Sequence, residues 1–277
     1  MIFSILFTAL SLAIFGVLAR FWPCNPGQPR YFGKDFKVDL TYFLIALLVY
    51  GNLSLALIKG ALTLAGGADE PRLFAAVEAG YGRLSHLPVA VQALLIVFLV
   101  DVMQYWLHRA FHTRPLWPFH AVHHSAEEVD WTTTFRNHPV NAVVYTVGVG
   151  VLVKLMGFSP LAFVIVAVFN FFSAAMVHAN LNWTFGPLKY VFASPVFHRW
   201  HHSSDPEVRD KNFAPTFAFL DLMFGTFHMP EGRLPDDYGA REVPQDFIGQ
   251  LIHPFRAIAA AARRRPGPAG PEATLRP

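Results

Sequence analysis

Three short histidine clusters decide how this chain is organised: His108-Arg-Ala-Phe-His112, His120-Ala-Val-His123-His124 and His198-Arg-Trp-His201-His202. They hold eight of the thirteen histidines in a chain of 277 residues. Residues three and four apart share one face of a helix, so each cluster can bring its imidazoles together within about one turn. Neutral imidazole is the commonest nitrogen ligand of zinc, iron, copper and nickel. The pattern therefore predicts a metal centre built from many histidines.

A structural role is the ordinary explanation of an isolated histidine, and we apply it to His86, His228 and His253. It does not account for the clusters, because so many chargeable rings packed without a metal would be costly at any pH that protonates them. Eight imidazoles also exceed the four ligands of a closed structural zinc site, which favours two metal ions with open positions. The single cysteine, Cys24, can form neither an internal disulfide nor a thiolate cluster, so we expect nitrogen and oxygen ligands.

The composition is typical of a membrane protein, with 53% hydrophobic residues, 15% charged residues and 27 phenylalanines. No basic stripe accompanies the net charge of +3, so we expect no nucleic-acid partner. The first apolar segment lacks the basic start and small-residue cleavage site of a secretory signal peptide, and we favour a membrane helix there. Five apolar segments are expected in all: Ile2–Val17, Leu40–Ile58, Pro88–Leu107, Val140–Val153 and Leu161–Val177.

These segments predict an all-α fold, in which several transmembrane helices carry a histidine-rich helical cap. Asp101, Gln104, His108 and His112 lie on one stripe of a continuous helix, which would lead from the membrane into the metal site. The fourth apolar segment is short for a span, and a tight turn at Gly157-Phe-Ser-Pro160 would return the chain to its starting side. The three clusters would then meet on one face of the membrane.

We divide the chain into three parts. Residues 1–87 would hold the N-terminal transmembrane helices and their connecting loop, and residues 88–235 the catalytic domain with the histidine clusters. Residues 236–277 would form a C-terminal tail that is partly disordered. Within these parts, residues 66–87 should form a loop with a short interfacial helix. The tail after Arg256 should be disordered or bound to the membrane surface, because it is rich in arginine, proline and glycine.

The order HxxxH, HxxHH, HxxHH between hydrophobic segments resembles the fatty acid hydroxylase and sterol desaturase superfamily, over roughly Leu95 to Pro230. Further matching pieces are Asp101-Val-Met-Gln-Tyr-Trp-Leu-His108, Arg136-Asn-His-Pro139, His178-Ala-Asn180 and Asp221-Leu-Met-Phe-Gly225-Thr226. The cluster order is highly specific, whereas each flanking piece is weak. The resemblance implies an integral-membrane, non-haem oxygenase with two metal ions that acts on a lipid.

It further implies that two iron ions, O2 and two external electrons insert one oxygen atom into the lipid or remove two hydrogens from it. Unactivated C–H bonds need a redox metal, and iron is the usual choice among nitrogen and oxygen ligands. The chain shows no cytochrome b5-like or ferredoxin-like segment, so we expect a separate electron-donor protein. Hydroxylation is favoured over desaturation by the resemblance alone. The lipid stays open between a fatty acyl chain, a sphingolipid, a sterol, a carotenoid and an ether lipid.

Nine histidines are our candidate metal ligands: His108, His112, His120, His123, His124, His178, His198, His201 and His202. Asp101 and His138 are predicted to support them from a second shell, with an interfacial role for Asp101 and a capping role for His138 as alternatives. Some relatives carry two histidines four residues apart near His178, and here the fourth residue on is Asn182. We therefore expect Asn182 close behind His178, and two metal ions that are inequivalent.

The loop with Arg20, Arg30, Lys34 and Lys37 and the tail with Arg263–Arg265 would lie on the same side as the histidines. The positive-inside rule then places the site on the cytoplasmic face. We favour a bacterial inner membrane over the endoplasmic reticulum. Basic residues in the second connecting loop weaken this argument without reversing it.

Other classes of function remain open. Zinc also favours imidazole, so a zinc-loaded form and a zinc hydrolase are alternatives. A non-enzymatic metal carrier or haem-binding protein of the membrane is another. A transporter would be expected to show repeated halves with ligands near mid-membrane, and neither feature is visible here.

Overall fold

The all-α prediction is confirmed by a computed structural model, which describes residues 2–29, 32–66 and 70–263. No strand occurs in these residues beyond one isolated bridge between Ser203 and Tyr238. The α-helices are α1 (Ile2–Phe21), α2 (Phe36–Ile45), α3 (Gly51–Gly66), α4 (Glu70–Ala79), α5 (Val89–Phe111), α6 (Trp117–His120), α7 (Pro139–Ala142), α8 (Val149–Lys154), α9 (Pro160–His178), α10 (Pro195–His201), α11 (Phe219–Met223) and α12 (Phe247–Arg263).

Shorter elements connect these helices. Two π-helical segments continue the helices on either side of them: η1 (Ala46–Tyr50) joins α2 to α3, and η6 (Val143–Gly148) joins α7 to α8. The 3-10 turns are η3 (Leu84–His86), η4 (His123–Ser125), η5 (Trp131–Phe135) and η7 (Gly186–Tyr190). Such π segments are rare in helices and often lie at functional sites.

Three continuous helical stretches of the described residues are long and apolar enough to cross a membrane. They are Phe36–Leu64 with 29 residues, Val89–Phe111 with 23 and Pro160–His178 with 19. Large apolar side chains such as Leu94 (68% exposed) and Val164 (59% exposed) point outward from them. Lipid tails accept such a surface without penalty, whereas water does not. The chain is therefore an integral membrane protein.

The other two predicted apolar segments also form helices, but shorter ones. Their apolar parts are Thr8–Phe21 in α1 and Pro139–Lys154 in α7, η6 and α8. The predicted hairpin after Lys154 is present: Gly157 turns the chain with a φ of +87°, and Ser159 begins α9 by accepting a hydrogen bond from the Ala162 N–H. A Cβ at Gly157 would clash with the Tyr81 carbonyl oxygen, so this turn requires glycine.

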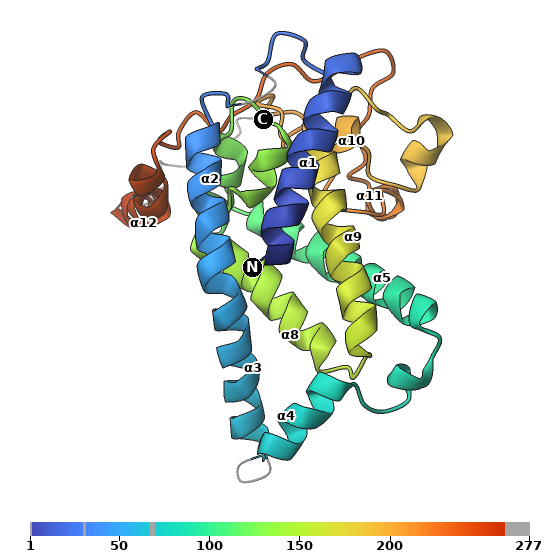
Figure 1. Cartoon of the computed structure of the whole chain (residues 1–277). Helices are drawn as coiled ribbons and strands as arrows, with labels where there is room; N and C mark the ends of the chain where they lie inside the picture. Colours follow the sequence, from blue (N-terminus) through green and yellow to red (C-terminus); the bar gives the residue numbers. More distant parts are fainter. Residues whose placement is uncertain (1, 30–31, 67–69, 264–277) are drawn as a thin grey trace, which may run out of the picture.

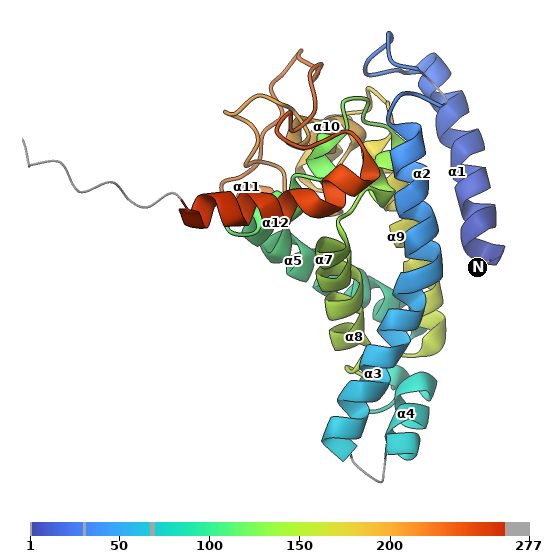
Figure 2. The same cartoon turned by 90° about the vertical axis from the view of Figure 1, so that its left-hand side faces the viewer.

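The hairpin packs onto α5 and closes the membrane part of the core. The buried residues between α5, α8 and α9 are Ala93, Ile96, Val149, Val153, Phe158, Ala162 and Val166. Figures 1 and 2 show α4 at one end of the molecule and the loops around α10 at the other. The helix ends that carry histidine gather at the α10 end, so the spanning helices support a cap as predicted.

Two expectations about connecting segments can be compared with the structure. The short helix expected between residues 66 and 87 is α4, and residues 67–69 lie outside the described residues. At the C-terminus, α12 continues to Arg263, beyond the point where we expected the tail to begin, and residues 264–277 lie outside the described part. Ile248, Ile252 and Phe255 form an exposed apolar stripe on α12. Figure 2 shows α12 crossing the direction of α2 and α3, as a helix on the membrane surface would.

Candidate metal centre

Each histidine of the centre is delivered by the end of a helix or by a short turn. His108 lies in the last turn of α5 and His112 follows as its C-cap, whereas His178 is the last residue of α9. His120 ends α6, and the 3-10 turn η4 carries the other two histidines of the second cluster. The third cluster lies in α10 and its C-cap, and Ser194 begins this helix by accepting a hydrogen bond from the Phe197 N–H. All nine imidazoles are buried.

The nine predicted ligands meet in two groups, and within each group one possible ligand atom from every residue lies within 4.8 Å of the others. The five-histidine group consists of His108, His112, His120, His124 and His201. The four-histidine group consists of His123, His178, His198 and His202. The second and third clusters each contribute to both groups, so the groups lie side by side. Their unequal size gives two sites of different composition.

Protein oxygens orient six of the nine rings through the Nδ1 atom. The partners are the carbonyl oxygens of Phe213 for His108 (2.8 Å), Arg136 for His123 (2.9 Å), Ala174 for His178 (2.7 Å) and Lys211 for His201 (2.7 Å), the amide oxygen of Asn141 for His120 (3.1 Å) and the carboxylate of Asp210 for His112 (3.0 Å). A carbonyl oxygen can only accept, so these Nδ1 atoms carry the proton. The Nε2 atoms of the same neutral rings are therefore bare and available to a metal.

In each group, Nε2 atoms of neighbouring rings face each other at short distance, and His178 and His198 add a further such contact at 3.0 Å. The Nε2 atoms of His108 and His120 are 2.9 Å apart, and those of His123 and His178 are 3.2 Å apart. Two lone pairs at this distance repel unless a cation lies beside both. Metal–nitrogen bonds of roughly 2.0–2.1 Å suit this separation for two ligands of one ion. Both groups therefore fit a bound metal ion.

Burial and the neighbouring imidazoles also suit metal binding. Burial, helped by nearby rings, holds the pKa of six imidazoles well below the usual 6.5: His120, His123, His124, His198, His201 and His202. Neutral imidazole is the form that binds metals, so these side chains need not lose a proton at neutral pH.

The three residues predicted to support the metal ligands make other contacts in the structure. Asp101 does not accept from an imidazole; its carboxylate accepts the Phe217 N–H at 2.9 Å and so holds the loop before α11. His138 takes its alternative role, since its Nδ1 accepts the Val140 N–H at 3.2 Å and thereby caps α7. Asn182 is exposed, and its backbone N–H donates to the Trp22 carbonyl at 2.9 Å. The expected support of His178 by Asn182 is therefore absent from the described contacts.

Sequence reasoning missed the residues that support the rings instead. Asn141 holds His120, and its own amide donates to Asn137 at 3.0 Å, which fixes the direction of the Asn141 oxygen. The other supports are mostly backbone carbonyls, which leave no mark in a sequence. Asn141 lies three residues after His138, but neither its residue type nor its position in the sequence indicated that it would orient an imidazole.

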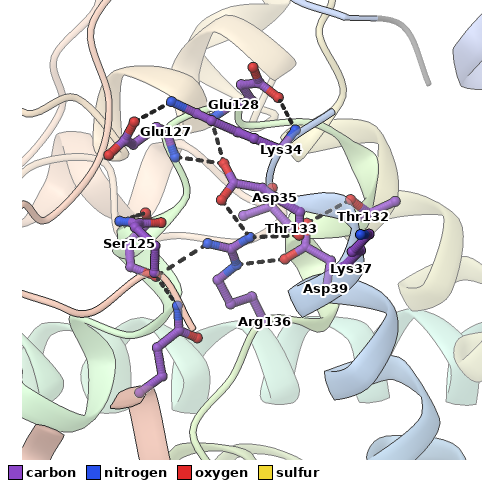
Figure 3. A network of polar contacts seen from close by, with 12 residues as sticks. Lys34, Asp35, Lys37, Asp39, Ser125, Glu127, Glu128, Thr132, Thr133 and Arg136 are labelled. Atoms are coloured by element: carbon purple, nitrogen blue, oxygen red, sulfur yellow. Dashed lines mark hydrogen bonds and ion pairs between the residues drawn. The ribbon is translucent and has the colours of Figure 1, made fainter. Parts of the chain in front are cut away.

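A buried ion-pair network supports the four-histidine group from α2 (Figure 3). Arg136 is fully buried and pairs with Asp39 at 2.5 Å and with Asp35 at 3.0 Å. Its backbone carbonyl accepts the His123 Nδ1–H, so the network fixes the segment that orients this ring. Asp35 also accepts the N–H groups of Glu127 and Glu128, which ties the loop after the second cluster to the start of α2.

An apolar cavity of about 580 Å³ reaches the two groups from among the membrane helices. Five imidazoles line it at one end: His108, His120, His123, His178 and His198. Phe43, Leu47, Phe135 and Phe171 provide much of its apolar wall. A separate space of about 10 Å³, which has room for roughly one water, is lined by His124 and His202. Ser204 and Arg209 line both this space and a groove of about 690 Å³. The histidine groups thus border an apolar cavity and a separate space about the size of one water.

Comparison with known proteins agrees with this geometry. Residues 93–226 match the sequence model of the fatty acid hydroxylase family. The chain is 27% identical to the ornithine lipid hydroxylase OlsE of Rhizobium tropici over 88% of this chain and 73% of that protein. It is 32% identical to an alkylglycerol monooxygenase of Caenorhabditis elegans over 60% of this chain and 32% of that protein.

A sphingolipid C4-hydroxylase, sur2 of Schizosaccharomyces pombe, is 30% identical over 53% of this chain and 51% of that protein. No solved structure matches the chain significantly. The matched region contains all three histidine clusters and His178, which are the residues that the structure brings together. Residues 93–226, just under half of the chain, are therefore similar to the fatty acid hydroxylase family in the region that carries the histidines.

Proposed function

We propose that this chain is a membrane-bound lipid hydroxylase that uses two iron ions, O2 and electrons from a separate donor protein. The observation that carries the proposal is the bare Nε2 atoms that face each other in each histidine group, at the end of an apolar cavity. The reaction would be RH + O2 + 2e⁻ + 2H⁺ → ROH + H2O. Iron is favoured over zinc because attack on an unactivated C–H bond needs a redox metal.

The residues of this chain would perform three tasks. The five-histidine and four-histidine groups would hold the two ions, and iron would supply the activation of O2. The carbonyls of Phe213 and Arg136 and the amide of Asn141 keep three of the rings turned toward the ions. The apolar wall of the cavity would hold a hydrocarbon chain with its reacting carbon near the histidines and would exclude water from them.

The substrate we propose is a polar lipid whose hydrocarbon chain enters the cavity from the membrane. An acyl chain of an amino lipid is favoured, since the ornithine lipid hydroxylase is similar over most of both chains. Sphingolipids, ether lipids and sterols are the competing substrates. Desaturation of the same chain would use the same oxidant and is the competing reaction.

Lipid analysis tests this proposal. Cells that express the chain should contain lipids heavier by one oxygen atom, and growth under 18O2 should label that oxygen. His201→Ala should abolish these lipids, because His201 belongs to the five-histidine group. His228→Ala is the matched control, since His228 lies outside both groups and packs against Trp200. Lipids that lose two hydrogens would assign desaturation, and an unchanged lipid profile would refute the proposal.

We also propose that the histidine end of the molecule faces the cytoplasm, in a bacterial inner membrane. The basic loop before α2 and the Arg263 end of α12 would lie on that side, as the positive-inside rule requires. After replacement of Cys24 by serine, a cysteine at Thr113 and one at Arg72 can be tested separately. Both positions are exposed; Thr113 directly follows the histidine-bearing end of α5, and Arg72 lies in α4. A membrane-impermeant thiol reagent added to intact cells should label only Arg72→Cys; labelling of Thr113→Cys would refute the orientation.

A further inference from the structure

The hydroxyl of Tyr145 is buried and has no hydrogen-bond partner among the described residues. A buried hydroxyl without a partner costs about as much as a lost hydrogen bond, so native proteins rarely keep one. Tyr145 lies in the π-helical segment η6, and such segments often occur at functional sites. Both features indicate that this hydroxyl donates a hydrogen bond to a bound ligand.

The ring of Tyr145 lies directly against the five-histidine group. Its centroid is 6.2 Å from that of His108, and it stacks on His120 at 6.5 Å with an angle of 9° between the planes. Phe111 supports it from the side at 5.5 Å. His108 and His120 are the two rings whose bare nitrogens face each other, so Tyr145 borders the place where a metal ion would bind.

Tyr145 also lines the apolar cavity, together with His108 and His120. Tyr50 offers a comparison within the same cavity. It lies in the other π-helical segment, η1, and its hydroxyl is likewise buried without a partner among the described residues. None of the ring contacts found in the described part of the chain joins Tyr50 to an imidazole. The two tyrosines thus share cavity, burial and backbone type but differ in their distance from the histidines.

We propose that the Tyr145 hydroxyl donates a hydrogen bond to the non-protein ligand at the open position of the metal in the five-histidine group. This ligand would be a small molecule or anion that binds the metal through oxygen or nitrogen, such as water or hydroxide. In an apolar site, a phenol hydroxyl is a good hydrogen-bond donor to such a ligand. This inference rests on the proposed function only in requiring a metal at that group. The hydroxyl donates without losing its proton, so no covalent step is involved.

Azide binding to the iron-loaded protein tests this role without measuring turnover. Azide is a small anion that fills open positions on ferric iron and adds an absorption band that can be titrated. The proteins compared are the unchanged chain, Tyr145→Phe and Tyr50→Phe, each with its iron content measured. Phenylalanine keeps the ring, so packing against His120 should be retained. A hydrogen bond to a charged group corresponds to roughly a tenfold to hundredfold change in affinity.

We expect Tyr145→Phe to bind azide at least tenfold more weakly with unchanged iron content, and Tyr50→Phe to stay within about twofold of the unchanged chain. Unchanged azide affinity in Tyr145→Phe would overturn the inference, as would equal weakening in both variants. Loss of iron in Tyr145→Phe would assign the ring a packing role and also overturn it. Absence of iron from the unchanged chain would refute the proposed function itself, which is a separate outcome.

Discussion

Replacement of Asp39 by alanine should destabilise the protein by about 3 kcal/mol, because it leaves the buried cation of Arg136 half paired. Arg136 is fully buried, and Asp39 holds its Nε at 2.5 Å while also accepting the Thr132 hydroxyl at 2.7 Å. Removal of one partner of a buried pair costs about 3–5 kcal/mol. Asp35 remains in contact with Arg136 at 3.0 Å, so we expect the lower end of this range.

The assay is thermal and denaturant unfolding of the metal-free protein in detergent. Arg136→Met in the Asp39→Ala background removes the half-paired cation and should recover part of the loss, so the two substitutions should not be additive. Lys34→Ala is the control from the same network, since its ion pair with Glu127 is exposed and should be worth less than about 1 kcal/mol. A loss below about 1 kcal/mol for Asp39→Ala, or strict additivity in the double variant, would refute the reasoning.

Asn141→Ala should weaken metal binding by the five-histidine group about 10-fold to 100-fold, because it removes the oxygen that orients His120. Asn182→Ala is the control and should bind metal normally. Competition with a chelator measures the metal affinity of both variants. The metal-free protein should lose stability as pH falls below about 6.5, which a series of unfolding curves would show. The sign follows from burial, which lowers the pKa of His120 and His202 in the folded state, so the unfolded chain binds more protons in this range. The slope should be about 1.4 kcal/mol per pH unit for each excess proton, and a protein more stable at pH 5 than at pH 7 would contradict it.

The metal groups were largely predictable because local spacing and chemistry carry the signal. Spacings of three and four residues place imidazoles on one face of a helix, and each cluster does lie in a helix end or tight turn. The division into two groups could not be predicted. His123 groups with His178 at the end of α9 and not with His120 and His124. Such contacts depend on tertiary packing, which local spacing does not encode.

The supporting contacts were predicted less well, for a related reason. Asp101 was expected to serve an imidazole because an acid in a membrane helix needs a partner, but the partner is the backbone N–H of Phe217. Backbone carbonyls and N–H groups satisfy much of this site, and any residue type can supply them. The spanning helices, by contrast, were predictable from apolar length alone. The π-helical segments η1 and η6 were not, because a run of apolar residues does not distinguish π-helical from α-helical winding.

The metal content of single histidine variants tests the central claim most directly. The purified chain should hold two iron ions, and His201→Ala and His198→Ala should each retain about one, since they remove a ligand from different groups. His228→Ala, outside both groups, should retain two. Two ions in both His201→Ala and His198→Ala, or no tightly bound metal in the unchanged chain, would contradict the account.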